Sequence, residues 1–334
     1  MMPDKRPAKV MVYGFDNALS SAITGVVDLF AQAGVTWQAI HGETRRPVFS
    51  VELVSARGTD IRCANGLTLK TDGALDPAIR PDVLLIPSIG SQLEEVLTSE
   101  QRLYPILRQY HQQQVDIAAN CTGVFLLAQA GILEGRQATT HWGFANAFAA
   151  AYPTVNLHSE KLHTMDENLF CAGGGMAWFD LALVLIERYA GTQVARQTAK
   201  AHVLDLPRFN QTLYAGSRRQ QHHQDELIKT VQSYLADHLR QPVALPQLAA
   251  QFNLTTRTLI RRFKAATGQT PVQYIQQIRI DHARKLLETQ RWTIERILSE
   301  IGYEDASSFS RLFKRQTGCS PSQYRSKFAP GDLL

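Results

Sequence analysis

The sequence lacks the patterns that mark membrane, secreted and metal-binding proteins. It contains no run of about 18 consecutive apolar residues, the length that a membrane-spanning helix requires. Its basic start, residues 1–7, leads into only about five strand-like residues, fewer than a signal peptide's apolar core needs. Its few cysteines show neither a paired spacing nor a metal pattern with histidine; they are Cys63, Cys121, Cys171 and Cys319. We therefore expect a cytoplasmic protein with reduced thiols, no membrane contact, no metal and no cofactor.

Length and charge divide the chain into two parts. Its 334 residues exceed what one hydrophobic core usually covers, so two domains are expected. Residues 1–205 carry 16 Lys and Arg against 20 Asp and Glu, a net charge of −4, whereas residues 206–334 carry 19 against 10, a net charge of +9. A basic C-terminal part suits a polyanion, and the acidic N-terminal part argues against the whole chain coating DNA.

Residues 206–223 read as the linker between these parts. The stretch is polar, has no helical periodicity, and carries three arginines and no acidic residue. Its His222–His223 pair has no further candidate ligands nearby, so a solvated linker is favoured over a metal site. The predicted domains are thus residues 1–205 and 224–334, and the second begins with a helix whose apolar face includes Leu227, Val231 and Leu235.

The C-terminal part contains the same pattern twice, 50 residues apart. The repeated residues are Phe263-Lys264 and Phe313-Lys314, Thr267-Gly268 and Thr317-Gly318, Pro271 and Pro321, and Gln273-Tyr274 and Gln323-Tyr324. A fixed offset at every matched position indicates a reused supersecondary unit.

Each repeat reads as a helix, a short turn and a second helix. Asn253 and Gly302 stand where a tight turn needs the left-handed conformation. Thr255 or Thr256 can cap the second helix of the first unit and Asp305 that of the second unit, and both helices end at a Thr-Gly pair. This is the pattern of a helix-turn-helix motif, whose second helix enters the DNA major groove.

The exposed side chains of the two second helices are of types that contact DNA. Arginine can bond a guanine edge through two hydrogen bonds, serine can reach more than one base, and lysine suits phosphate. The predicted DNA-binding residues are Arg257, Thr258, Arg261 and Lys264 in the first unit, and Ser307, Ser308, Ser310, Arg311 and Lys314 in the second.

Residues 302–315 (GYEDASSFSRLFKR), followed by Thr317, Gly318 and Pro321, closely resemble the signature of the AraC/XylS family of transcription regulators. The resemblance covers about the last hundred residues. It implies two helix-turn-helix units joined by one long helix, at about residues 271–287, that read adjacent major-groove segments of double-stranded DNA.

The first 205 residues alternate strand and helix patterns, which predicts a doubly wound α/β sandwich with a parallel sheet. Strands are expected at residues 9–13, 48–54, 82–87 and 115–119. Helices are expected at residues 20–32, 92–112, 122–130, 176–189 and 192–204. Ligands in such sheets bind at the carboxyl ends of the strands.

Cys121 stands where the strand at 115–119 turns abruptly into a helix. A thiol on such a turn projects at the sheet edge beside a helix N-terminus, which favours the thiolate. His141 follows close enough in the chain to serve as a partner. Taken alone, such a cysteine is more often part of the core and such a histidine more often structural.

Residues 121–128 (CTGVFLLA) and 138–142 (ATTHW) resemble the class I glutamine amidotransferase-like fold of the Pfp-type peptidase superfamily, in the branch fused to AraC-type DNA-binding domains. The resemblance covers most of residues 8–190. It implies an elbow cysteine with a histidine, backbone donors near a glycine-rich turn, and often an acidic residue from the first helix.

The sequence departs from that catalytic pattern. The turn after the third strand reads Pro87-Ser88-Ile89-Gly90, which breaks up the expected pair of glycines, and the expected acidic position falls near Ala22. Because a nucleophile needs its base and an oxyanion hole together, we expect a binding pocket in which Cys121 and His141 are vestiges of catalysis. The predicted ligand-binding residues are Phe15, Asp16, Ser88, Ile89, Cys121, Thr122, His141 and Gly174.

The sequence therefore predicts a homodimeric transcription regulator, an activator that contacts RNA polymerase and binds paired operator half-sites. Its N-terminal domain is expected to bind a small, nitrogenous effector, because the resembling regulators control amino-acid or quaternary-amine catabolism. Two alternatives stay open. One is a Cys-dependent amidase or hydrolase fused to a DNA-binding domain, and the other is constitutive DNA binding with an N-terminal domain used only for dimerisation.

Overall fold

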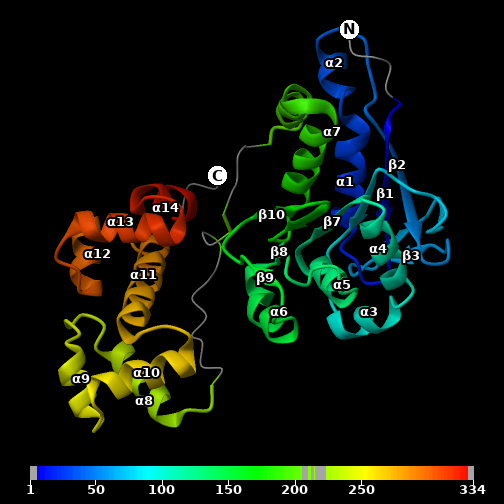
Figure 1. Cartoon of the computed structure of the whole chain (residues 1–334). Helices are drawn as coiled ribbons and strands as arrows, with labels where there is room; N and C mark the ends of the chain where they lie inside the picture. Colours follow the sequence, from blue (N-terminus) through cyan, green and yellow to red (C-terminus); the bar gives the residue numbers. More distant parts are fainter. Residues whose placement is uncertain (1–5, 205–209, 212–213, 215–222, 330–334) are drawn as a thin grey trace. The chain divides into compact units, whose positions relative to one another are not determined.

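The computed structural model describes residues 6–204, 210–211, 214 and 223–329. The chain divides into two units, residues 1–212 and 213–334 (Figure 1). The two units have separate hydrophobic cores. Most of the predicted linker, including His222, lies outside the described residues. Asn210, Gln211, Tyr214 and His223 are its described members.

A seven-stranded sheet forms the centre of the first unit, in the order β10-β11-β7-β6-β1-β2-β5. Its strands are β1 (Ala8–Tyr13), β2 (Phe49–Ser55), β5 (Gly73–Ala74), β6 (Val83–Ile86), β7 (Asp116–Asn120), β10 (His163–Asp166) and β11 (Leu169–Ala172). All neighbouring strands pair in parallel except β10, which runs antiparallel to β11 at one edge. Every residue of β6 and β7 is buried, as in a sheet covered on both faces.

Helices and two small two-stranded sheets, one antiparallel and one parallel, surround this sheet. The helices are α1 (Ser20–Gln32), α2 (Thr36–Ile40), α3 (Leu93–Ser99), α4 (Leu103–Gln112), α5 (Val124–Gln129), α6 (Ala145–Ala151) and α7 (Trp178–Ala201), with 3-10 turns η1 (Cys121–Gly123) and η2 (Trp142–Phe144). The short strands are β3 (Ile61–Arg62) with β4 (Thr68–Leu69), and β8 (Gln137–Ala138) with β9 (Asn156–Leu157). Helices α1 and α7 pack against each other, as do α4 and α5. This arrangement confirms the predicted α/β sandwich.

One helix prediction in this unit is wrong in detail. The single helix expected at residues 92–112 is broken into α3 and α4 at Glu100, whose side chain accepts a hydrogen bond from the buried Tyr13 hydroxyl at 2.5 Å. The separation expected between helices at 176–189 and 192–204 is confirmed, because α7 consists of two helical segments that meet at Gly191, where the backbone is not helical (φ +85°).

The second unit is built from helices. They are α8 (Glu226–Asp237), α9 (Leu245–Gln251), α10 (Thr256–Thr267), α11 (Pro271–Thr289), α12 (Ile294–Ile301), α13 (Ala306–Thr317) and α14 (Pro321–Phe328). Helix α11 has 19 residues, which makes it about 28 Å long at roughly 1.5 Å per residue. Its first half packs Tyr274 and Ile275 into a core with α8, α9 and α10, and its second half packs Ile280 to Leu287 into a core with α12, α13 and α14. The expected joining helix at 271–287 is therefore confirmed.

Among the residues that the structure describes, no helix has both the length and the apolar character needed to cross a lipid bilayer.

Candidate functional site

The local sequence fixes both helix-turn-helix units in the same way. Before α10, Asn253 takes the left-handed conformation (φ +54°), and before α13 Gly302 does so (φ +73°). The side chain of Thr255, and not Thr256, caps α10 by accepting from the Thr258 N–H at 3.2 Å. Asp305 caps α13 by accepting from two backbone N–H groups at 3.0 Å. The turn and cap residues expected from the repeat are confirmed.

Both second helices bury their apolar sides and expose polar ones. In α10, Leu259 and Phe263 are fully buried, whereas the predicted DNA-binding residues Arg257, Arg261 and Lys264 are exposed. Thr258 is half-buried and shares a hydrogen bond between hydroxyls with Thr255 at 2.9 Å. Helix α10 thus presents a positively charged face.

Helix α13 has the same division. Phe309 and Phe313 are fully buried, and the predicted residues on the other side are Ser307, Ser308, Arg311 and Lys314, all exposed, with Ser310 half-buried. The Arg311 guanidinium donates to the Ser308 hydroxyl at 3.2 Å, which aligns the two side chains along one ridge of the helix. Two equivalent helices of the repeat therefore offer arginine, serine and lysine to solvent.

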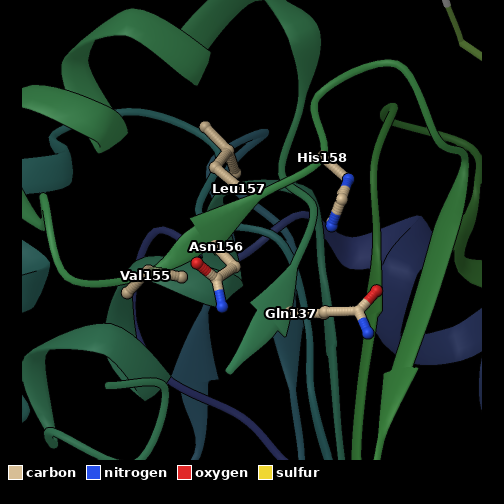
Figure 2. Close-up of a pocket in the computed structure, with 5 residues that line it drawn as sticks. All are labelled: Gln137, Val155, Asn156, Leu157 and His158. Atoms are coloured by element: carbon tan, nitrogen blue, oxygen red, sulfur yellow. The ribbon is translucent and has the colours of Figure 1, made fainter. Parts of the chain in front are cut away.

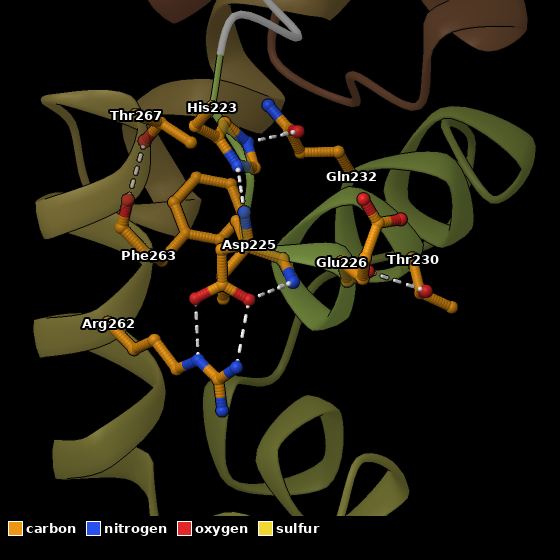
Figure 3. A network of polar contacts seen from close by, with 9 residues as sticks. His223, Asp225, Glu226, Thr230, Gln232, Arg262, Phe263 and Thr267 are labelled. Atoms are coloured by element: carbon orange, nitrogen blue, oxygen red, sulfur yellow. Dashed lines mark hydrogen bonds and ion pairs between the residues drawn. The ribbon is translucent and has the colours of Figure 1, made fainter.

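Arg262, which lies beside Arg261, has a different role. It forms a two-bond ion pair with Asp225, from Nε at 2.6 Å and from Nη2 at 2.9 Å (Figure 3). Asp225 also caps α8 by accepting from the Ile228 N–H at 3.1 Å, and the guanidinium holds the pKa of its carboxyl below the usual range. The Asp225 N–H donates in turn to His223 at 3.3 Å. Sequence reasoning missed this pair, although an Asp just before a helix is a signal of an N-cap.

In the first unit, Cys121 occupies a sharp turn directly after β7. Its backbone is left-handed, with φ at +57°, a conformation that side-chain-bearing residues rarely adopt. The thiol is buried, and burial raises its pKa against the smaller opposing effect of hydrogen bonds with Ser88 and Thr122. Cys121 thus has the backbone of an elbow cysteine with a thiol that stays protonated at neutral pH.

The loops after β1 and β6 meet beside this turn. Ala18 and Ile89 form an isolated antiparallel bridge, and the Thr122 hydroxyl donates to the Ile89 carbonyl at 2.8 Å. Ser88 is buried and accepts from the Asn120 amide at 2.8 Å. Four of the predicted ligand-binding residues, Ser88, Ile89, Cys121 and Thr122, are therefore brought together.

The remaining residues of the predicted pocket have varied environments. Phe15 is buried, while Asp16 is exposed and accepts from the Arg62 N–H at 2.7 Å. His141 is half-buried, and its Nδ1 accepts from the Gly143 N–H at 2.9 Å. The Thr140 hydroxyl donates to the Cys121 carbonyl at 2.8 Å, which anchors the turn that carries His141 next to the elbow. The expected acidic position, Ala22, is fully buried.

Gly174, the last predicted pocket residue, points to a contact that the sequence did not indicate. Its backbone is left-handed (φ +54°), and its N–H donates to the side chain of Gln211 at 3.1 Å. Gln211 belongs to the stretch expected to be a solvated linker, yet its side chain is buried in the first unit. Nothing in the sequence around it distinguishes it from the other glutamines of that stretch.

A separate surface pocket of about 660 Å³ lies beside β8 and β9 (Figure 2). Gln137, Val155, Asn156, Leu157 and His158 line it, and none of these is a predicted site residue. Across the described ranges, no group of three or more His, Cys, Asp or Glu side chains is placed to hold a metal ion.

Comparisons with known proteins match both parts of the chain. The family model described as "DJ-1/PfpI family" matches residues 8–188, and one described as "Helix-turn-helix domain" matches residues 248–327. The chain is 31% identical over 281 residues to the "HTH-type transcriptional regulator CdhR" of Pseudomonas aeruginosa, covering 82% of this chain and 80% of that protein. It is 24% identical over 299 residues to the "HTH-type transcriptional regulator GlxA" of Rhizobium meliloti, covering 89% and 91%.

Among solved structures, a putative transcriptional regulator protein from Vibrio parahaemolyticus is similar to this chain. It aligns with a TM-score of 0.51 at 20% identity, over 58% of this chain and 98% of that chain. At this identity the match supports the fold of the first unit alone.

Proposed function

This chain belongs to the DJ-1/PfpI family and is a DNA-binding transcription regulator of the AraC type, and from that premise we propose that residues 1–205 sense a small metabolite. In this proposal, residues 206–223 link that domain to a DNA-binding domain at residues 224–334. The DNA-binding function is supported by the pair of equivalent helices α10 and α13. Both bury an apolar face, and on their other sides α10 exposes arginine and α13 exposes arginine and serine.

We assign base contacts to the exposed residues in the N-terminal halves of these helices. Arg257, Arg261 and Arg311 are placed to read guanine edges, and Ser307 and Ser308 to reach other bases. Lys264 and Lys314, nearer the helix ends, suit phosphate oxygens, which position the protein on the duplex. Thr258 and Ser310, which are half-buried, complete the predicted set with more limited reach.

The sensor proposal rests on the chemistry around Cys121. Nucleophilic attack uses the thiolate, yet burial raises the pKa of this thiol. The loop that would supply an oxyanion hole carries Ser88 and Ile89 in place of paired glycines. The neighbouring Asn120 is fully buried, and its Oδ1 has no hydrogen-bond partner within the described part of the chain, so a bound ligand with an N–H group would satisfy it. These features favour a binding pocket without catalysis.

The alternative function is a Cys-dependent amidase. One observation favours it, namely the left-handed backbone of Cys121, which is the conformation of an elbow nucleophile. A single experiment separates the two functions, because an enzyme consumes its ligand and a sensor returns it unchanged.

That experiment is a thermal-shift screen of the full chain with amino acids, quaternary amines and small amides, in which each hit is also assayed for turnover. A ligand at 100 times its dissociation constant adds about 2.7 kcal/mol to the free energy of unfolding. The sensor proposal expects a compound that stabilises the protein, remains unchanged and alters operator affinity. A compound that wild type consumes and the Cys121→Ala variant only binds would establish the amidase instead.

The proposal also includes a homodimer, formed through the first domain, that acts in the cytoplasm and activates transcription through RNA polymerase. Symmetric dimers are the commonest oligomers and suit paired half-sites. Effector binding would favour the arrangement of the two domains that places both helix-turn-helix pairs on DNA, a shift between existing states. The molar mass of the full chain by light scattering, and reporter expression with and without the regulator, test these two parts.

A further inference from the structure

The side-chain amide of Gln211 is held by five hydrogen bonds inside the first unit. Its oxygen accepts from the backbone N–H of Trp142 at 3.2 Å and of Gly174 at 3.1 Å. Its nitrogen donates to the Thr140 carbonyl at 2.7 Å, the Lys161 carbonyl at 3.2 Å and the Thr139 hydroxyl at 3.2 Å. The residue is 1% exposed, so these bonds form out of contact with bulk water.

We call these five groups, on Thr139, Thr140, Trp142, Lys161 and Gly174, the amide slot. The fold makes room for an amide here through Gly173. A Cβ atom at Gly173 would lie 2.2 to 2.6 Å from the Gln211 carboxamide atoms, closer than any packed contact allows. A side chain at position 173 would therefore occupy the space that the carboxamide fills.

The chemistry of the slot selects a primary carboxamide. Two N–H donors face one end and two carbonyls with a hydroxyl face the other, which matches the oxygen and the NH₂ group of –CONH₂. A carboxylate of the same shape would set a charged oxygen against two carbonyl oxygens, and burying that unpaired acceptor is costly. A methyl or alkyl group would remove the bonds to the Trp142 and Gly174 N–H groups and to the Thr140 carbonyl, whereas the Thr139 hydroxyl and the Lys161 carbonyl would keep the bond between them at 2.9 Å.

The slot adjoins the predicted pocket. Thr140 links it to the elbow, since its carbonyl accepts from Gln211 while its hydroxyl donates to the Cys121 carbonyl. Gly174 and the turn at residues 141–142 belong to both.

We propose that the amide slot is a recognition site for primary carboxamides, that Gln211 is its built-in occupant, and that a small molecule with a –CONH₂ group competes with Gln211 for it. This inference assigns a ligand class to the proposed sensor domain. Its regulatory part, that the ligand alters DNA binding, rests on the proposed function.

Competition at this site lets the effector act on the segment that connects the two units. The backbone next to Gln211 is also attached, through a bridge between Asn210 and Lys161 and a hydrogen bond from the Gln211 N–H to the Glu160 carbonyl at 3.0 Å. Asp225, which caps the first helix of the second unit, follows 14 residues later in the chain. Displacement of Gln211 therefore changes the point at which the connecting segment is attached to the first unit.

A tethered occupant also sets the affinity of a competitor. The apparent dissociation constant of a ligand rises in inverse proportion to the fraction of protein whose site is open. Because the slot is filled by Gln211, a simple amide should bind wild type at least about 10-fold more weakly than a variant without that side chain.

The test measures hydrogen exchange of the Trp142 and Gly174 amides in the full chain, with propionamide as the probe and propionate as its carboxylate control. Gln211→Ala should speed exchange of both amides about 10-fold or more, and millimolar propionamide should restore protection while propionate should not. Gln211→Ser, a second truncation that also leaves the slot open, should behave as Gln211→Ala does, which covers the case in which one substitution disturbs folding. Gly173→Ala should expose the same amides and should not be rescued, because its methyl group fills the slot.

Two results would overturn the inference. One is a failure of propionamide to protect the amides of either Gln211 variant, and the other is equal protection by propionate. The same experiment separates this inference from the sensor proposal. If propionamide fills the slot but no compound alters operator affinity, the proposal of an amide slot is supported and the sensor proposal is wrong. If another class of compound alters operator affinity while propionamide does not bind, the sensor stands and the amide site falls.

Discussion

At Cys121, the backbone angle φ is +57° and the thiol is buried between Ser88 and Thr122. The raised pKa of this thiol determines both its reactivity and its effect on stability. The folded-state value lies above the roughly 8.5 of an unfolded chain. The stability that the neutral thiol contributes is therefore fully present below that pH and is lost as pH rises through the folded value.

We predict slow alkylation of Cys121 in the native protein. At pH 7, iodoacetamide should label it at least about 10-fold more slowly than the same cysteine in the urea-unfolded chain, because the reactive thiolate is scarce and the site is buried. The labelling rate should rise with pH at higher pH values than in the unfolded chain, because burial raises the pKa of the thiol. Mass spectrometry of the peptide that contains Cys121 provides the measurement, and rapid labelling at pH 7 would show an activated nucleophile and favour the amidase.

Asp225 stabilises α8 in two ways, as its N-cap and as the partner of Arg262. We predict that Asp225→Ala lowers the free energy of unfolding by about 0.5–2 kcal/mol, the usual effect of losing a cap. Asp225→Asn keeps the cap and removes the charge, so it should lower the free energy of unfolding by less than Asp225→Ala does. It should also remove the pH dependence that the carboxylate gives to stability.

The pKa of Asp225 is lowered chiefly by its hydrogen bonds with Arg262. The ion pair therefore contributes above the unfolded pKa of roughly 3.9, and this contribution disappears as pH falls through the lower folded value. Urea unfolding of the second unit at pH 7 and pH 3 measures the effect. An equal loss of stability on acidification in wild type and Asp225→Asn would contradict this account.

At the scale of elements, helix α1 approaches α7 through Gly25. A Cβ atom there would lie 2.2 to 2.7 Å from ring atoms of Trp178, the first residue of α7. We predict that Gly25→Ala destabilises the protein by about 1–3 kcal/mol through overpacking, despite alanine's better helix propensity. Gly73→Ala, where a Cβ would have no atom within 4 Å, is the matched control. Thermal unfolding compares the two, and the prediction fails if Gly25→Ala is as stable as Gly73→Ala.

The sequence was informative wherever a local pattern decides an element. Helix α11 and the second helices of both units follow from repeated Thr-Gly and Pro positions, because helix caps are local interactions. The break between α3 and α4 was not predictable in this way. It occurs at Glu100, whose side chain bonds to Tyr13, a residue 87 positions away in the chain.

The same distinction explains the candidate site. Ser88, Ile89, Cys121 and Thr122 come together because parallel strands end at one sheet edge, which the strand pattern predicts. Gln211 and Arg262 were missed because their roles depend on tertiary partners, the amide slot and Asp225. Nothing in the local sequence separates Gln211 from a solvated glutamine or Arg262 from the neighbouring Arg261.

At the scale of the whole molecule, the duplicated unit implies two DNA contacts in one chain. Helix α11 contributes to both cores of the second unit, so α10 and α13 belong to one structure and should read two adjacent segments of the same DNA face. Such segments are expected about one helical turn, roughly 10 base pairs, apart. Arg261 and Arg311 occupy equivalent positions in the repeat, and each should specify its own segment.

The assignment of α10 and α13 as base-reading helices is tested most directly by selecting bound sequences from a random DNA pool. The proteins compared are wild type and the variants Arg261→Ala, Arg311→Ala and Arg262→Ala. Wild type should select two conserved segments about one turn apart. Arg261→Ala and Arg311→Ala should each lose the preference in a different segment, at a cost of about 1–3 kcal/mol in affinity for the wild-type site. Arg262→Ala should keep both preferences, because that side chain pairs with Asp225. If Arg261→Ala and Arg311→Ala instead keep both segments and weaken binding to all sequences alike, these arginines contact phosphate and the assignment of α10 and α13 as base-reading helices is wrong.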